Sequence, residues 1–230
     1  MQTTSLVKFA LVFSIMILVA CVPKVSSPTA VSATSVQSVQ PLREPRHEWI
    51  TRWLNQEVCT PPCWEEIVPG ETLLKDAIVL VEGIPDAKIT GEWEQVFEWE
   101  MAGSDFGKAF TNLELRIAGN DSITWIGISI NKNQSVVIEE VVDVYGSPSY
   151  IQVVDCNDVG SCDTNLIYSS IGMALHLYLE LNPEGNVEIK GDSTIFQLLF
   201  FVPGIENYMA VSPYRFGSLK HWEGYGYYSQ

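Results

Sequence analysis

The spacing of apolar residues predicts a short helix where the folded part of the chain begins. Within residues 48–57, Trp49, Ile50, Trp53 and Leu54 occupy the i, i+1, i+4 and i+5 positions of one helical face. Two prolines in the cysteine-bounded loop that follows exclude any continuation of this helix. We therefore expect an opening helix that ends before a proline-rich loop.

A second helix is predicted from Thr72 to Gly83. Ala77, Ile78 and Val81 supply its apolar face. Thr72 is expected to be its N-cap, because a threonine hydroxyl accepts a hydrogen bond from an early backbone N–H group. The Gly-Ile-Pro sequence that starts at Gly83 is expected to end the helix, since proline cannot continue it.

From residue 87 the hydrophobic pattern changes to a period of two, which is the period of a β-strand. Residues 92–101 alternate between aromatic or apolar side chains and glutamates, so they predict one strand with an aromatic face and an acidic face. Residues 110–117 and 123–130 predict two more strands, joined by a turn at residues 118–121. Together these strands predict an antiparallel meander.

The same order of patterns then recurs. Residues 136–145 have helical apolar periodicity, and a Gly-Ser-Pro sequence starting at Gly146 is expected to end that helix. The repetition predicts an α+β domain of two related halves, in each of which a helix precedes an antiparallel meander and packs on the sheet. The halves are about residues 45–131 and 132–230. Strands of the second half are expected at residues 150–156, 166–170, 173–181 and 194–202.

Residues 1–44 lack these patterns and indicate export. Lys8 precedes an unbroken apolar run, and the sequence Leu-Val-Ala-Cys ending at Cys21 resembles a lipobox. The run is too short for the roughly 20 residues that span a bilayer, which favours residues 1–20 as a lipoprotein signal peptide. Cys21 is then the lipidated first residue of the mature chain, and residues 22–44 form a disordered tether. We expect an extracytoplasmic domain at residues 45–230, anchored to a bacterial membrane.

Charge narrows the class of partner. The chain has 13 basic and 28 acidic residues, a formal charge of −15, and loss of Lys8 with the leader makes it −16. Such a surface repels nucleic acid and an anionic bilayer alike. A cationic partner, a divalent ion or solubility alone remain as explanations.

Four cysteines remain once Cys21 is lipidated, and they form two close pairs, Cys59 with Cys63 and Cys156 with Cys162. Export permits disulfides, and local pairing is the natural one of three connectivities. Copper binding by the first pair with a remote histidine is an alternative. The pair lacks both a βαβ context and the redox Cys-x-x-Cys spacing, which favours a structural disulfide.

No sequence motif predicts a metal site, a cofactor or a catalytic centre. The three histidines, His47, His176 and His221, are too far apart in sequence for a His-x-x-x-His metal site. The closest approach to a hydrolase nucleophile elbow surrounds Ser129, within a predicted strand and without the second glycine. Phosphate and dinucleotide loops are absent.

Acidic residues crowd the second cysteine loop, where Asp155, Asn157, Asp158 and Asp163 offer oxygen ligands for Ca²⁺. Their offsets do not fit the EF-hand spacing. A polar hairpin tip tied by the adjacent disulfide is the favoured interpretation.

Two further features are candidates for partner binding. Glu92, Glu94, Glu98 and Glu100 place like charges two residues apart, so this face is either solvated or matched by a basic partner. Two of these glutamates are also candidates for a glycosidase acid and base. The second feature is a set of aromatic residues among glycines near the C-terminus, namely Tyr214, Trp222, Tyr225 and Tyr227. Such residues suit recognition of a sugar or a protein. The alternative is a closing strand packed on the sheet.

Two short motifs carry a resemblance to known families. The sequence from Ile67 to Thr72, Ile-Val-Pro-Gly-Glu-Thr, followed by Gly-Ile-Pro at Gly83, resembles SmpA/OmlA-type lipoprotein domains, which are similar to the β-lactamase-inhibitor-like fold. The resemblance implies helices packed on an antiparallel sheet and a role in binding other proteins. Cys59-x-x-Pro-Cys-Trp, with the Pro-Gly-x-Thr that follows, also resembles uncharacterised lipoproteins of Chloroflexi-type bacteria. The chain is about twice one such unit, so no functional residue is carried over.

The sequence thus predicts a membrane-tethered binding or interaction module of the cell envelope, without a catalytic centre. Its expected partners are the membrane, through the lipid anchor, and an envelope protein or glycan. One alternative is a carboxylate-dependent glycan hydrolase, and another is a structural surface lipoprotein.

Overall fold

The computed structural model describes residues 46–85, 87–93, 96–101, 104–111, 121–157, 160–212 and 218–229. All of them belong to the unit Leu42–Gln230. The predicted leader, Cys21 and the tether lie outside the described residues, as do Glu94, Tyr214 and most of the turn expected at residues 118–121. Within the described ranges, no helix has both the length and the apolar character needed to cross a membrane.

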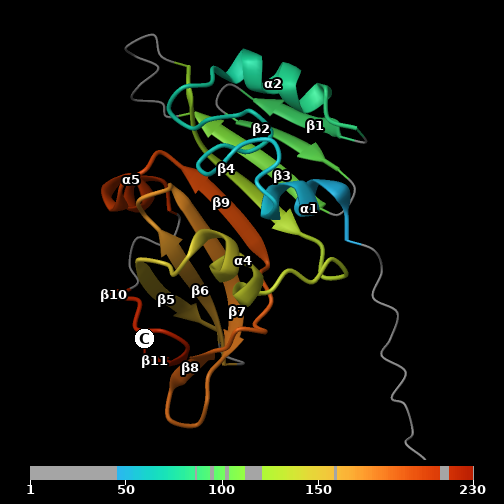
Figure 1. Ribbon diagram of the computed structural model, residues 1–230. Coiled ribbons are helices and arrows are strands. Elements are labelled where there is room, and N and C mark those ends of the chain that lie inside the picture. The colour runs from blue at the N-terminus through green and yellow to red at the C-terminus, as the bar shows by residue number, and fades with distance from the viewer. Residues whose placement is uncertain are drawn as a thin grey trace, which may run out of the picture. The chain divides into compact units, whose positions relative to one another are not determined.

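A nine-stranded antiparallel sheet runs through the molecule in the order β1-β2-β3-β4-β9-β7-β6-β5-β10 (Figure 1). A second sheet pairs β8 with β11. Helices and antiparallel sheets together confirm the α+β class. The strands are β1 (Lys88–Trp93), β2 (Val96–Glu100), β3 (Ser104–Thr111), β4 (Ile123–Ile130), β5 (Tyr150–Cys156), β6 (Ser161–Tyr168), β7 (Met173–Glu180), β8 (Asn186–Ile189), β9 (Gln197–Phe201), β10 (Ser218–His221) and β11 (Gly226–Ser229).

The described helices are α1 (Glu48–Leu54), α2 (Leu74–Glu82), α4 (Ile138–Tyr145) and α5 (Ile205–Val211). The first three lie where the apolar periodicity predicts them, and Gly83 and Gly146 cap α2 and α4 as expected. The expected N-cap is wrong. Helix α2 begins two residues after Thr72, whose hydroxyl instead accepts a hydrogen bond from the backbone N–H of Val68 at 2.8 Å.

The single strand predicted over residues 92–101 is also wrong, because two strands occupy this part of the chain. Strand β1 ends at Trp93, and β2 returns antiparallel from Val96. A two-residue connection leaves the alternation of apolar and polar residues intact along the sequence, which is why periodicity did not reveal the turn.

The nine-stranded sheet consists of two antiparallel strand groups that meet at its centre. The first meander is β1-β2-β3-β4, and the second meander is β5-β6-β7-β9, whose outer strand β5 also pairs with the ninth strand, β10. Helix α2 precedes the first group and α4 precedes the second. Strands β4 and β9 join the groups, with Trp125 opposite Phe201 and Ser129 opposite Gln197.

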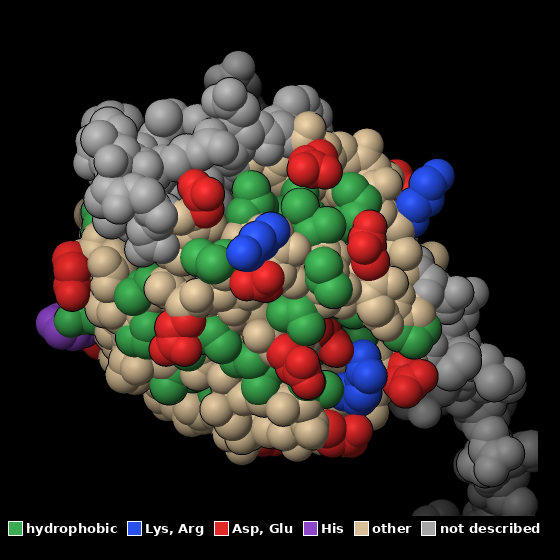
Figure 2. Space-filling view, turned by 90° about the horizontal axis from the view of Figure 1, so that it is seen from above, with side chains coloured by type: hydrophobic (Ala, Val, Ile, Leu, Met, Phe, Trp, Pro, Cys, Tyr) green, Lys and Arg blue, Asp and Glu red, His purple; other side chains and the backbone are tan. Residues whose placement is uncertain are grey.

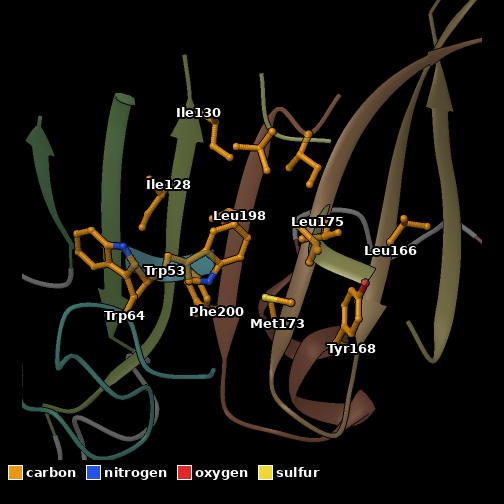
Figure 3. Packing of buried hydrophobic residues seen from close by; sticks show 14 of the residues in the cluster. Trp53, Trp64, Ile128, Ile130, Leu166, Tyr168, Met173, Leu175, Leu198 and Phe200 are labelled. Atoms are coloured by element: carbon orange, nitrogen blue, oxygen red, sulfur yellow. The ribbon is translucent and has the colours of Figure 1, made fainter. Parts of the chain in front are cut away.

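The main core lies between the sheet and helices α1, α2 and α4. Ile128 of β4, Leu198 and Phe200 of β9 and Leu175 of β7 are fully buried in it, and Figure 3 shows them on the same side of the sheet. Trp53 of α1 packs edge-on against Phe200, with ring centroids 6.5 Å apart. Each such side chain stabilises the fold by about 1.5–3 kcal/mol through burial. We call the side of the sheet that faces α1, α2 and α4 the helix-facing side, and the opposite side the reverse side.

Helix α5, which the sequence patterns did not predict, packs on the opposite side. Tyr208 of α5 is fully buried there against Phe201, with ring centroids 5.4 Å apart, in a cluster with Ile167 and Ala174. The Tyr208 hydroxyl donates to Gln152 Oε1 at 2.9 Å. This reverse side of the second meander therefore has a core of its own.

Candidate functional site

The four cysteines of the described residues form two disulfides, and both pairings are the local ones that the sequence predicts. Cys59 is bonded to Cys63 and Cys156 to Cys162. The second pair joins neighbouring strands, because Cys156 and Cys162 are partners in the β5–β6 ladder. None of the four therefore carries a free thiol for copper binding or thiol exchange.

The loop after the first disulfide anchors an aromatic stack. Glu65 and Glu66 adopt positive φ, 46° and 68°, in a tight turn closed by paired backbone hydrogen bonds between Trp64 and Ile67. This turn holds the fully buried Trp64 stacked on Trp99 of β2, with ring centroids 5.4 Å apart. The loop is thereby part of the core of the first meander.

A buried ion pair accompanies this turn. Arg52 of α1 donates to Glu65 Oε1 at 2.9 Å. Burial raises the pKa of the Glu65 carboxyl, and the Arg52 charge offsets part of that increase. These contacts join α1 to the loop, so we interpret both residues as structural.

The four candidate glutamates do not share one face. Glu98 and Glu100 alternate with the buried Phe97 and Trp99 on β2, so both project to the reverse side. Glu92 is the cross-strand partner of Phe97 and therefore lies on the helix-facing side. The fourth, Glu94, lies outside the described residues.

The register also weakens the alternative of a glycosidase acid and base. Lys88 lies opposite Glu100, so part of the acidic charge on the reverse side has a basic neighbour. A glycosidase needs two carboxyls on either side of one bond, about 5 to 9.5 Å apart. Glu92 cannot form that pair with Glu98 or Glu100 across the sheet. Glu92 lines a cavity whose described lining residues include neither Glu98 nor Glu100.

A row of polar side chains crosses the reverse side at a single level. Ser129, Gln197, His176, Asn165 and Gln152 are successive cross-strand partners on β4, β9, β7, β6 and β5. Four of them are buried, and Gln197 is half-buried. Sequence reasoning did not bring these residues together, because the row exists only through pairing between strands that are distant in sequence.

This row is not a nucleophilic triad. His176 Nε2 lies 3.2 Å from Asp163 Oδ1, as a triad requires, but Ser129 is two strands away. Strands are about 4.8 Å apart, so the serine lies about 10 Å from the histidine, beyond proton-transfer distance. Within the part of the chain that the structure describes, Ser129 Oγ and Asn165 Nδ2 are buried without a hydrogen-bond partner.

In the loop with candidate Ca²⁺ ligands, two of the side chains make hydrogen bonds within the protein. Asn157 Oδ1 accepts a hydrogen bond from the backbone N–H of Ser161 at 2.9 Å, and Asp163 contacts His176. Asp158 lies outside the described residues. In the described ranges no three His, Cys, Asp or Glu side chains are grouped to hold a metal ion.

The C-terminal aromatic residues lie in β11 and in the segment before it, and β11 pairs with β8 in the two-stranded sheet. Trp222 stacks on Tyr228 with ring centroids 5.8 Å apart, and the Tyr228 hydroxyl donates to the carbonyl of Gly224 at 2.6 Å. Tyr228 is buried, whereas Tyr225 is 48% and Tyr227 63% exposed. The stacked rings of half-buried Trp222 and buried Tyr228 therefore lie beside two tyrosines that are exposed to solvent.

Carboxylates surround these tyrosines. Tyr227 lies opposite Glu188 in the β8–β11 ladder, and its hydrogen bond to that carboxylate raises the pKa of its hydroxyl. The pKa of Tyr225 is raised by burial and by the charges of Glu139 and Asp143 on α4. We call these five residues the tyrosine patch.

Comparison with known proteins gives no information about function. No family model, no curated protein and no solved structure matches the chain. The resemblance to SmpA/OmlA-type domains therefore stays a prediction from motifs.

Proposed function

We propose that this protein is a lipid-anchored, extracytoplasmic binding module of a bacterial envelope, and that the tyrosine patch contacts its partner. The lipobox at Cys21 supports the anchor. The observation that carries the binding role is the exposure of Tyr225 and Tyr227 beside the stacked rings of half-buried Trp222 and buried Tyr228. Tyrosine and tryptophan are enriched at protein interfaces, because they offer a large contact area with little loss of rotamer freedom.

The chemistry of the patch favours a protein partner with basic side chains. A lysine or arginine can lie over an exposed tyrosine ring while its charge meets Glu188, Glu139 or Asp143. Attraction between the acidic domain and a basic partner also speeds their association at low salt. We therefore expect partner binding to weaken as ionic strength rises.

The anchor is tested with Cys21→Ser. Two or more acyl chains hold a protein stably at a membrane, and the substituted chain has no acceptor for them. We expect the wild-type protein in the membrane fraction and the variant outside it, measured by fractionation and immunoblotting. Retention of Cys21→Ser in the membrane fraction would contradict the lipoprotein assignment.

The patch is tested by crosslinking in the intact envelope with full-length variants. The test variant is Tyr225→Ala with Tyr227→Ala. The matched control is Tyr178→Ala, which removes a tyrosine of similar exposure, 53%, from a different part of the sheet. A third variant, Glu98→Gln with Glu100→Gln, tests the acidic strand face. The identified partner is then titrated as a purified protein.

We expect one saturable partner whose affinity falls at least about tenfold in the double tyrosine variant and is unchanged in Tyr178→Ala, as loss of a hot-spot contact predicts. Equal loss in Tyr178→Ala would overturn the assignment of the patch. Loss only in the glutamate variant would move the interface to β2. The absence of any saturable partner would reject the adaptor role and favour a structural surface lipoprotein.

The proposal extends to the origin of the sheet. We infer that the two meanders are related halves, since each follows a helix capped by glycine, and since β4 and β9 hold equivalent final positions in the two groups. The Gly-x-Pro sequences at Gly83 and Gly146 support this relation. Superposition of an experimental structure of one half on the other tests it.

A further inference from the structure

A cavity of about 270 Å³ lies between helix α2 and strand β1. Its apolar wall comes from α2 and the residue before it, through Leu73, Leu74 and Ile78. Three charged side chains complete the lining, namely Lys75, Glu92 and Asp121. The volume is close to the lower end of ligand sites, about 300 Å³, which suits a molecule the size of an amino acid.

The position of Glu92 in this cavity results from an irregularity in β1. Ile89 pairs with Trp99, and Glu92 pairs with Phe97, so both lie on the helix-facing side although they are three residues apart. A regular strand would place them on opposite sides. The register shift between Ile89 and Gly91 therefore brings a carboxylate to the side that α2 covers, a use of β-bulges that is common beside functional sites.

The wall opposite Glu92 is held by backbone hydrogen bonds. The N–H of Leu74 donates to the carbonyl of Asp121 at 2.9 Å, and the N–H of Ile123 donates to the carbonyl of Thr72 at 2.8 Å. The start of α2 is thus tied to the start of β4. The backbone at Lys75 and Asp121 is therefore already ordered before a ligand binds, and this lowers the entropic cost of binding.

The charges define the ligand. Two carboxylates and one ammonium group complement a molecule with two ammonium groups and one carboxylate, and the apolar wall complements a methylene chain between them. Figure 2, which looks at the α2 end of the molecule, shows carboxylates spread among exposed hydrophobic side chains with few basic groups. This surface attracts cations.

We propose that the cavity between α2 and β1 binds a free diamino acid of the lysine or ornithine type. Lys75 meets its carboxylate, Glu92 and Asp121 meet its two ammonium groups, and Ile78 contacts its methylene chain. The cavity and the tyrosine patch use different residues and elements. Failure of one proposal therefore leaves the other intact.

Calorimetric titration of the full-length protein in detergent micelles tests the proposal, with L-lysine as the probe. Nε-acetyl-lysine lacks one ammonium charge, and pentane-1,5-diamine lacks the carboxylate. The variants are Glu92→Gln, Asp121→Asn and Lys75→Met, with Glu184→Gln and Lys132→Met as exposed controls outside the cavity. Circular dichroism melting of each variant verifies its fold.

We expect saturable binding of L-lysine that weakens at least about tenfold in Glu92→Gln and in Asp121→Asn, and for Nε-acetyl-lysine on the wild type. Lys75→Met should weaken lysine binding and leave pentane-1,5-diamine binding unchanged, because only lysine has the carboxylate. No saturable lysine signal, or an equal loss in Glu184→Gln, would overturn the proposal. If a cavity variant melts at a lower temperature, the ligand series on the wild type decides alone.

Discussion

Alternate residues of β9 face two different cores. Leu198 and Phe200 point to the helices on one side, while Phe201 points to α5 on the other. The first meander has a comparable core on its helix-facing side, where Phe97 and Trp99 are fully buried. On its reverse side, the neighbouring residues of β2 are half-buried or exposed, and no described helix other than α5 packs on that side of the sheet.

The two meanders are alike on the side that stabilises the sheet and differ on the reverse side. Both meanders bury one side against helices, as a two-layer fold requires. Among the described residues, the second core lies on the second meander, and the buried polar row runs alongside it. The first meander instead holds the irregular strand that directs Glu92 into a cavity.

The largest expected effect tests whether the two cores of the second meander are equally important. Phe200→Ala and Phe201→Ala each remove a fully buried ring, so each should lower the free energy of unfolding by about 4 kcal/mol. Urea denaturation of both variants measures the difference. A loss below about 1 kcal/mol for Phe201→Ala would mean that α5 does not close a second core.

A pair of glycines compares the two sides of the first meander. An alanine Cβ at Gly107 would overlap the indole of Trp99, which is buried and stacked, so Gly107→Ala should cost about 3 kcal/mol. At Gly127 the Cβ would lie 2.8 Å from the ring of Trp125, a longer contact with a side chain that is only half-buried, so about 1 kcal/mol is expected. Equal losses in denaturation would contradict the difference between the sides.

Tyr208→Phe tests the polar contact beneath α5. The variant leaves Gln152 without the Tyr208 donor, which should cost about 1.5 kcal/mol at neutral pH. Burial raises the pKa of Tyr208 to about 12, from an unfolded value of about 10. Its contribution is therefore complete below pH 10 and is lost as the pH rises toward 12.

The wild-type protein should consequently lose stability between pH 10 and 11 more steeply than Tyr208→Phe does. Burial also raises the pKa values of Tyr145 and Tyr168, so both proteins lose some stability as the pH rises over this range. Denaturation at pH 8, 10 and 11 measures it. Identical slopes would show that Tyr208 ionises as freely in the folded chain as in the unfolded one.

A smaller effect is expected where the start of the domain joins α4. Arg46 donates to both carboxylate oxygens of Glu140, at 2.9 and 3.0 Å, and Glu140 also accepts from the N–H of Val137. In Glu140→Gln the side chain still accepts from the N–H of Val137 but has no charge. We therefore expect the free energy of unfolding to fall by about 1 kcal/mol. The loss should shrink in 1 M salt, and an unchanged loss would exclude an electrostatic origin.

The smallest effect on stability is expected in the tyrosine patch. Tyr227→Phe removes one hydroxyl from an exposed ring, and the midpoint of urea denaturation should not shift measurably. The variant should nevertheless bind the partner more weakly than wild type does. A large loss of stability would instead assign the Tyr227–Glu188 contact a structural role.

Local patterns determined much of this fold. Helices α1, α2 and α4 lie where periodicity predicts them, because one apolar stripe is a property of adjacent turns. Strands β4 and β5 have the predicted bounds, and both disulfides join cysteines that are close in sequence. The proposed export signal likewise rests on a contiguous motif, which is read without reference to the fold.

Only the tertiary structure decided which residues share a side of the sheet. The chain reversal between Trp93 and Val96 placed Glu92 and Glu98 on opposite sides of the sheet, although the two glutamates look equivalent in the alternating sequence. A shift of one residue moves every following side chain to the other side, and the pairing that sets it joins distant segments. The polar row, the second core under α5 and the cavity beside α2 all depend on such pairing.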